Sequence, residues 1–241
     1  MKRVRTQLRA ELMLIARNGE QLLLTLVIPV ILLAFFGSVD VLPTTGSDPL
    51  SFLVPGVLAV AIMSTSMVSL GIATGFERSY LVLKRLGATP LTRGELVLAK
   101  IISVFVVEIV QLAVLLPIGY ALGWRISGTA WPLTVAVVLL GTSAFAGIGL
   151  ILSGRLRAEI NLAAQNGLYL VLLLLGGMII PQDSLPAPLA SAANVFPSTA
   201  LADLLRSTLN GDSQSLVTPF VVLAVWAVLA PAVAARRFRW S

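Results

Sequence analysis

Residues 77–100 read ERSYLVLKRLGATPLTRGELVLAK and connect two long apolar runs, residues 50–76 and 96–122. This connecting stretch holds five of the seventeen basic residues of the chain. Each neighbouring run is long enough to cross a bilayer as a helix, which takes roughly 17 to 25 apolar residues. The pattern therefore predicts two membrane-spanning helices joined by a basic connection outside the hydrocarbon layer.

The composition of the whole chain also indicates a membrane protein. Of its 241 residues, 57% are hydrophobic and 12% are charged, whereas ordinary soluble domains have about 25% charged residues. Six apolar runs are long enough to span a bilayer, and they lack the alternation of β-barrel strands. These runs cover residues 21–39, 50–76, 96–122, 131–152, 162–180 and 216–235. We therefore expect an all-α membrane protein, a single domain over residues 1–241 with six transmembrane helices.

The distribution of basic residues predicts the orientation of the chain. Fifteen of the seventeen lie before the first run or after the second, fourth or sixth run, while all five Asp residues lie in the segments between. Because short cytoplasmic segments carry the excess of Lys and Arg, we expect a multi-pass protein of the inner or plasma membrane with cytoplasmic N- and C-termini. The first run is longer than a signal-peptide core, so we expect it to be retained.

The chain lacks several residue types that enzymes and nucleic-acid-binding proteins use. It has no Cys and no His, which removes the commonest metal ligands and the commonest general base, so we predict no metal site and no catalytic residue. The cations form no basic face interleaved with aromatic residues, so we expect no nucleic acid partner. No Gly-Lys dipeptide is present, although the phosphate-binding loop of ATPases requires one. ATP hydrolysis would therefore need another polypeptide.

Residues 1–20 precede the first run and show helical periodicity. Four apolar residues fall on one stripe of a helix and four basic residues fall on the other side. The two sets are Val4, Leu8, Leu12 and Ile15, and Lys2, Arg5, Arg9 and Arg17. This pattern predicts an amphipathic helix lying in the membrane interface. A solvated basic tail is the alternative.

The connection at residues 77–95 contains signals for two helical pieces. Thr92 and Glu95 have the spacing of a capping box, so a helix should begin there. Gly87 and Pro90 separate it from a shorter basic helix upstream. A short helix, a rigid corner and a capped helix make a shaped surface, which favours docking of a cytoplasmic partner. A loop whose cations only reach back toward the membrane surface is the alternative.

Two segments resemble a known family. Residues 77–100, with an initial Glu, LKRLGATPL and a helix restart, resemble the signature between the second and third spans of the ABC transporter type-two permeases, which include daunorubicin-resistance-like drug, lipid and polysaccharide exporters. Gly87 stands where that family often has Arg. Residues 176–206, GGMIIPQDSLPAPLASAANVFPSTALADLLR, are similar to the family's exit from the fifth span, with a short outer helix and an LR ending.

The resemblance implies a transmembrane subunit that forms a dimer, with a homodimer favoured over two different permeases, surrounded by membrane lipid. It also implies separate ABC ATPase subunits that bind ATP and Mg²⁺, so we expect no cofactor in this chain. In this family the coupling helix follows the second span, which makes residues 77–95 the expected cytoplasmic coupling loop. We expect five residues to contact the ATPase subunit: Glu77, Arg78, Lys84, Arg85 and Leu86.

Residues 181–215 contain two segments that are too short to span a membrane, SLPAPLASAANVF and STALADLLRSTL. Irregular backbone at membrane depth has to be buried in protein or face a water-filled cavity. We therefore expect an extracytoplasmic helical hairpin, either re-entrant or in the outer leaflet. An ordinary external loop is the alternative.

Several polar residues fall inside the predicted spans. Glu108 and Gln111 share a helix face near mid-membrane, where ionisable side chains are costly and usually face the bundle interior or a cavity. We expect them on a substrate or proton pathway, with hydrogen-bonded packing as the alternative. A polar patch at the start of the fifth run extends this expected pathway: Asn161, Gln165 and Asn166. Small residues of the second run predict close helix contacts or the dimer seam: Ser64, Gly71 and Gly75.

These observations favour one of three functions. The first is the permease subunit of an ATP-driven exporter that moves amphipathic drugs, lipids or glycolipids out of the cytoplasm, as in antibiotic efflux. The second is an ion-coupled secondary transporter, which would show matching halves; residues 1–120 and 121–241 show no convincing similarity. The third is an intramembrane enzyme, which would need a base near GTSAF at residues 141–145. Since that motif has no such base, we expect transport rather than catalysis.

Overall fold

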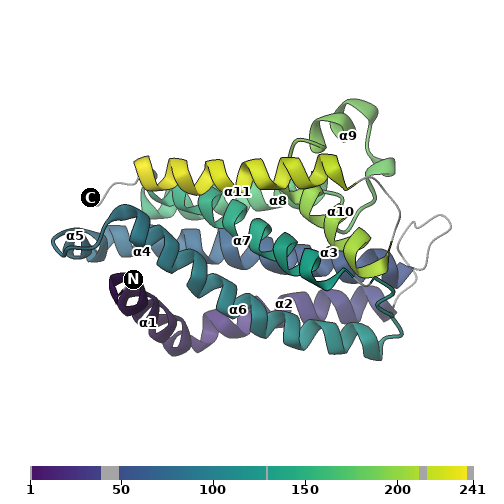
Figure 1. Cartoon of the computed structure of the whole chain (residues 1–241), viewed down its shortest axis with the longest axis horizontal. Helices are drawn as coiled ribbons and strands as arrows, with labels where there is room; N and C mark the ends of the chain where they lie inside the picture. Colours follow the sequence, from purple (N-terminus) through teal and green to yellow (C-terminus); the bar gives the residue numbers. More distant parts are fainter. Residues whose placement is uncertain (1, 39–48, 129, 212–215, 238–241) are drawn as a thin grey trace.

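The computed structural model describes residues 2–38, 49–128, 130–211 and 216–237. Within these ranges every regular element is helical, which confirms the predicted all-α class. The elements are α1 (Lys2–Arg17), α2 (Gly19–Ser38), α3 (Pro49–Met63), η1 (a π-helix, Ser64–Ser69), α4 (Leu70–Ser79), α5 (Val82–Gly87), α6 (Arg93–Ala121), α7 (Trp131–Ser153), α8 (Ala158–Leu175), η2 (a 3-10 helix, Gln182–Ser184), α9 (Ala187–Ala193), α10 (Pro197–Asn210) and α11 (Val217–Arg237). The long helices lie side by side along the long axis of the molecule (Figure 1).

Five helical stretches in the described residues are long and apolar enough to cross a membrane. They are Pro49–Ser79, Arg93–Ala121, Trp131–Ser153, Ala158–Leu175 and Val217–Arg237. These stretches match the second to sixth predicted runs. The first run falls on α2, whose apolar part is the shorter Thr25–Gly37, and residue 39 lies outside the described residues. The count of six spans therefore stays a prediction.

The second predicted run forms the centre of the bundle. It is one continuous helical stretch of 31 residues in which η1 interrupts the α-helical hydrogen-bonding pattern between α3 and α4. Every residue of α3 from Leu53 to Met63 is buried, because α2, α6, α7 and α10 all pack against this helix. Apolar residues on all sides are typical of a helix surrounded by other helices rather than by lipid. The hydrophobic core is therefore built around α3.

The fifth predicted span ends earlier than its hydrophobicity suggests. The prediction extended it to residue 180, whereas α8 ends at Leu175 and is followed by Gly176 and Gly177. Gly177 has a φ of +64°, in the left-handed region that glycine adopts without steric cost. Met178 is apolar but lies outside the helix, fully buried in the core. The Gly-Gly pair thus stops the helix although the apolar residues continue.

Residues 181–211 fold as the 3-10 helix η2 and the helices α9 and α10, at the end of the molecule away from the start of α1 and the end of α11 (Figure 1). Residues 212–215 of the predicted hairpin lie outside the described residues. α10 packs against α3 and α7 and is largely buried. Its Arg206 donates hydrogen bonds to the carbonyl oxygens of Gly177 and Met178, at 2.5 and 3.1 Å, and lies over the ring of Phe52, 3.8 Å from its centroid. These contacts fix α10 to the ends of α3 and α8. Whether the pair is re-entrant stays a prediction.

Candidate functional site

The segments that carry most of the basic residues meet at one end of the molecule, which we call the basic end. Three arginine side chains donate hydrogen bonds between these segments: Arg3 Nη1 to Pro90 O at 2.8 Å, Arg78 Nη1 to Ser153 O at 3.0 Å, and Arg93 Nη1 to Arg236 O at 3.5 Å. They join the start of α1, the end of α4, the α5–α6 corner and the ends of α7 and α11. Most of the basic residues that the structure describes therefore lie at one end of the molecule, while Arg125 and Arg206 lie toward the other.

The connection between α4 and α6 forms the tip of the basic end (Figure 1). Thr92 and Glu95 make the predicted capping box: Thr92 N donates to Glu95 Oε2 at 2.8 Å, and Glu95 N donates to Thr92 Oγ1 at 3.2 Å. The short helix expected upstream is α5. Leu81, between α4 and α5, has a φ of 61°, and this left-handed residue turns α5 away from the axis of α4.

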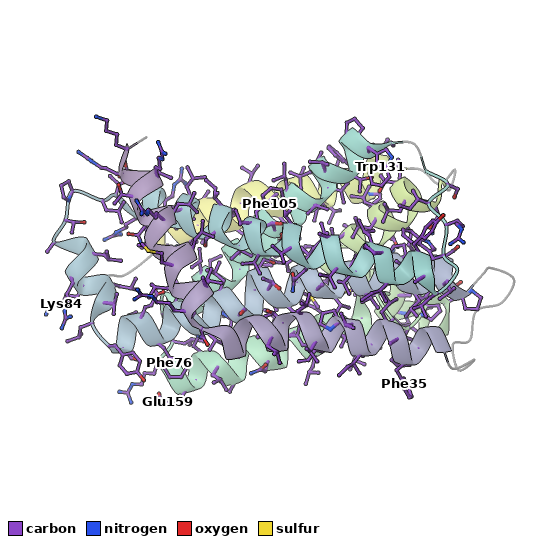
Figure 2. The ribbon with its side chains drawn as sticks, turned by 90° about the horizontal axis from the view of Figure 1, so that it is seen from below. Phe35, Phe76, Lys84, Phe105, Trp131 and Glu159 are labelled. Atoms are coloured by element: carbon purple, nitrogen blue, oxygen red, sulfur yellow. The ribbon has the colours of Figure 1, made fainter. Side chains whose placement is uncertain are left out.

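The predicted docking residues do not all face outward. Lys84 and Arg85 are exposed on α5, and Lys84 lies at the extreme end of the molecule (Figure 2). Leu86 is half-buried, and Arg78 is half-buried with its guanidinium bonded to Ser153 O. Glu77 does not belong to the connection at all, because α4 continues to Ser79 and its carboxylate points toward α6. Of the five predicted docking residues, Lys84 and Arg85 are therefore the two that are fully available to a partner.

An exposed apolar group lies beside Lys84 and Arg85. Tyr80, Leu81 and Val82 are 69%, 52% and 36% exposed. They occupy the turn from α4 into α5, so the tip presents both apolar surface and positive charge. A partner with an apolar pocket and an acidic rim would match this surface.

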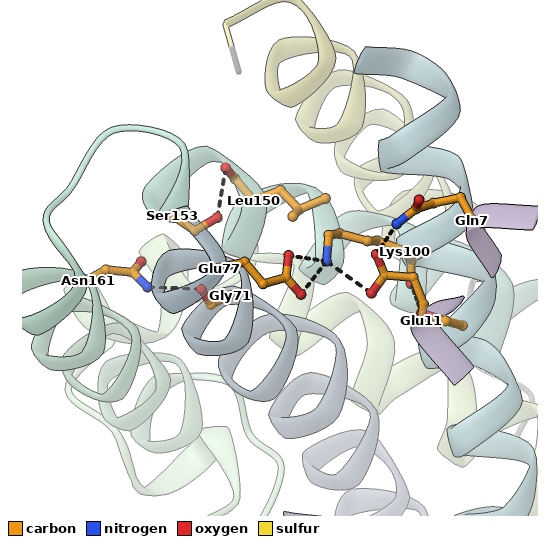
Figure 3. Close-up of polar contacts among 9 residues, drawn as sticks. Gln7, Glu11, Gly71, Glu77, Lys100, Leu150, Ser153 and Asn161 are labelled. Atoms are coloured by element: carbon orange, nitrogen blue, oxygen red, sulfur yellow. Dashed lines mark hydrogen bonds and ion pairs between the residues drawn. The ribbon is translucent and has the colours of Figure 1, made fainter. Parts of the chain in front are cut away.

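Glu11, Glu77 and Lys100 form an ionic triad behind the tip, in which Glu11 and Lys100 are buried and Glu77 is half-buried (Figure 3). Lys100 Nζ on α6 lies 3.1 Å from Glu11 Oε2 on α1, and 3.0 and 2.8 Å from the two carboxylate oxygens of Glu77 on α4. Gln7 Nε2 donates to the second oxygen of Glu11 at 2.8 Å. The side chain of Lys100 is 1% exposed. Its three N–H groups therefore have three carboxylate acceptors, and the triad joins α1 to both α4 and α6.

Glu11 was not predicted to belong to this site, although the sequence held a signal for its inward position. It is an acidic residue in a strongly basic helix, and it lies three residues after Leu8 and four before Ile15. That spacing puts it on the inward stripe of α1. An acidic side chain on an inward stripe needs a buried cation as its partner. Lys100 was the candidate, because it lies inside the apolar run that forms α6.

The polar residues near mid-span are buried and bonded to one another. Thr142 Oγ1 on α7 hydrogen-bonds to the carboxyl of Glu108 on α6. Gln111 accepts a hydrogen bond from Thr65 Oγ1 at 3.0 Å and donates one to Thr25 O at 2.8 Å. These contacts tie α2, η1, α6 and α7 together, while the other carboxyl oxygen of Glu108 is buried without a hydrogen-bond partner among the described residues. A pathway role for Glu108 and Gln111 stays a prediction.

Asn161 and Gln165 lie in the contact between α8 and its neighbours. Asn161 Nδ2 donates to Gly71 O on α4 at 2.9 Å, and Gln165 Nε2 donates to Gly149 O on α7 at 2.9 Å. A Cβ at Gly71 would overlap the Gln165 side chain. Both amides are buried, so the structure places them between helices. The remaining residues of these predicted sets lie elsewhere: Asn166 is exposed on α8, Gly75 faces the Asn161 side chain, and Ser64 begins η1.

The fold and the basic end define a multi-pass helical membrane protein with a helix–corner–helix connection after its central span. A profile of the ABC-2 type transporter family matches residues 2–210. The probable multidrug ABC transporter permease YbhS of Escherichia coli K12 is 27% identical over 161 residues, which are 65% of this chain and 42% of YbhS. The putative transport permease YvfS of Bacillus subtilis 168 is 25% identical over 219 residues, 89% of each chain.

The chain belongs to the ABC-2 type transporter family, a family of transport permeases rather than catalytic enzymes. The match confirms the resemblance that residues 77–100 and 176–206 suggested. The chain spans less than half the length of YbhS and most of the length of YvfS.

Proposed function

We propose that the chain is the transmembrane permease subunit of an ATP-driven ABC exporter in the inner or plasma membrane, with both termini in the cytoplasm. Membership of the ABC-2 family carries this proposal. The cargo is an amphipathic drug, lipid or glycolipid moved out of the cytoplasm. The multidrug description of the relative YbhS supports this class of cargo.

A separate ABC ATPase subunit docks on the tip of the basic end and supplies the energy. The exposed α5, with Lys84, Arg85 and the apolar turn at residues 80–82, is the surface that supports this assignment. Leu86 adds apolar contact, while Glu77 and Arg78 act from behind by fixing the end of α4 to α6 and α7. ATP and Mg²⁺ bind to the ATPase subunit, since this chain has no Gly-Lys dipeptide.

The permease works as a dimer of two identical chains. Transport proceeds by alternating access at the interface between the two copies. The apolar outward surfaces of α8 and α11 support this arrangement. Only 22% of the apolar window of each of these helices is buried within the single chain, which leaves large surfaces for a second copy and for lipid.

The docking proposal is tested by reversing charge at the tip. The double variant Lys84→Glu/Arg85→Glu should lose ATPase subunits during purification from the native membrane, and substrate should no longer stimulate ATP turnover. Arg155→Glu/Arg157→Glu is the matched control, because these arginines are exposed between α7 and α8, outside α5. Both variants should insert normally, since no buried contact is changed.

Unchanged ATPase co-purification and unchanged coupling in the Lys84/Arg85 variant would refute docking at α5. A wild-type chain that co-purifies with no ATPase, and that transports on a proton gradient alone, would instead favour the secondary transporter. Comparing the wild type with both double variants therefore tests docking at α5 and the energy source of transport independently of each other.

A further inference from the structure

A groove of about 470 Å³ lies beside the ionic triad, lined by residues of α1, α2, η1, α4 and α6. Its lining includes Glu77, near the basic end, and Thr65, twelve residues earlier in the same continuous helical stretch. At 1.5 Å per residue this separation is about 18 Å. The groove therefore extends from the basic end of the molecule toward the middle of the span.

The two ends of the groove differ in chemistry. Charged side chains gather near the basic end: Glu11, Arg17, Glu77 and Lys100. Apolar side chains line most of the remaining length, among them Leu70, Ala73, Phe76, Val104 and Val107. The hydroxyl-bearing residues Thr25, Thr65, Ser69 and Ser103 also line it. A ligand that fills such a groove has a polar head and an apolar chain. If the basic end faces a membrane surface, the head lies at the level of the lipid headgroups and the chain lies among the lipid tails.

The charges at the head of the groove include both signs. The two carboxylates of the triad share one ammonium, which leaves an excess of one negative charge there. The side chain of Glu77 is 19% exposed while that of Glu11 is 7% exposed, so Glu77 is the carboxylate that a ligand can reach. Arg17 ends α1 at the same groove and is exposed. A head that carries one cation and one anion matches this pair.

We propose that this groove binds a phospholipid whose head carries a primary ammonium group and a phosphate. The ammonium donates hydrogen bonds to the Glu77 carboxylate, the phosphate pairs with the Arg17 guanidinium, and one acyl chain lies against Leu70, Phe76 and Val104. A primary ammonium has N–H donors, whereas the quaternary ammonium of phosphatidylcholine has none, so the carboxylate distinguishes the two heads. Phosphatidylglycerol lacks the cation altogether. This site does not depend on the proposed transport function.

The test uses the purified chain in nanodiscs that contain phosphatidylethanolamine, phosphatidylcholine and phosphatidylglycerol in equal amounts. Native mass spectrometry then identifies the lipids that stay bound when the disc is removed. We expect phosphatidylethanolamine to be retained over each of the other two lipids by about threefold, a modest ratio because Glu77 is already shared with Lys100. Glu77→Gln should abolish this preference. Glu159→Gln, which changes an exposed carboxylate on α8, should keep it.

A second variant keeps the test decisive if Glu77→Gln fails to fold. Ala73→Trp fills the apolar part of the groove without changing a charge, and it should lower the retained phosphatidylethanolamine while retention of the other lipids is unchanged. Equal retention of the three lipids by the wild type would overturn the proposal. So would a full phosphatidylethanolamine preference in either folded groove variant.

Discussion

At the scale of single residues, Lys100 and its two carboxylate partners determine how α1 is held. Lys100 lies inside the apolar run that forms α6, and its side chain is almost completely removed from solvent. A buried charge that loses its partners costs several kcal/mol, although an intact buried pair adds little net stability over an apolar replacement. The triad therefore acts mainly on specificity: α1 packs where both Glu11 and Glu77 can reach the same ammonium.

Removing the Lys100 ammonium should lower the free energy of unfolding more than removing one of its carboxylate partners. Lys100→Met leaves two carboxylates facing each other, and we expect it to lower the free energy of unfolding by roughly 3–5 kcal/mol. Glu11→Gln keeps the Lys100–Glu77 pair and an acceptor oxygen for Lys100, so it should cost less. Thermal unfolding in detergent measures both, with the exposed Lys84→Met as the control. A Lys100→Met variant as stable as the control would contradict the structure of the triad.

The same triad shows what the sequence leaves undetermined. The capping box at Thr92 and Glu95 was predicted correctly, because the two side chains interact with backbone only three residues away. Glu77 was assigned to the outer surface, because its inward direction depends on Lys100 and Glu11, which lie 23 and 66 residues away in the chain. Local pattern fixes the start of a helix. It does not fix which of two charged faces turns inward.

At the scale of helices, close contact of α4 with α8 depends on glycines that face amides. Asn161 donates to the carbonyl oxygen of Gly71, and Gln165 occupies the space that a Gly71 side chain would need. Both sides of this contact were singled out from the sequence: the small residues of the second apolar run, and the polar patch of the fifth apolar run. The polar patch was predicted to line a substrate pathway, because polarity alone does not distinguish a water-filled cavity from a helix interface.

We predict that Gly71→Ala separates these two helices. The added methyl group would overlap the buried Gln165 amide, and this amide cannot move away without losing its hydrogen bond to Gly149 O. We therefore expect a loss of about 1–3 kcal/mol in unfolding free energy. Gly167→Ala on α8 is the matched control, since no atom lies within 4 Å of its added methyl group. That variant should be neutral or slightly stabilising, because Ala is the better helix former. Thermal unfolding of the two variants in the same detergent measures the difference; equal midpoints would show that α4 and α8 are not in close contact.

At the scale of the whole molecule, orientation follows from which end carries the cations. Arg3, Arg78 and Arg93 each bridge two of the segments at the basic end, while α9 and α10 lie at the other end (Figure 1). Because Lys and Arg concentrate on the cytoplasmic side of membrane proteins, the basic end should be cytoplasmic and α9 should be external. An ATPase subunit is then able to reach α5, and the groove beside the triad opens at the inner leaflet.

This orientation is testable in intact cells because the chain has no native Cys. Ala88→Cys places a thiol in the exposed α5–α6 corner, and Ser191→Cys places one on the exposed surface of α9. A maleimide that does not cross membranes should label Ser191→Cys in intact cells and label Ala88→Cys only after permeabilisation. Equal labelling of both variants in permeabilised cells is the control for reactivity. Labelling of Ala88→Cys from outside would place α5 beyond the reach of a cytoplasmic ATPase, and the proposed coupling at the basic end would then be wrong.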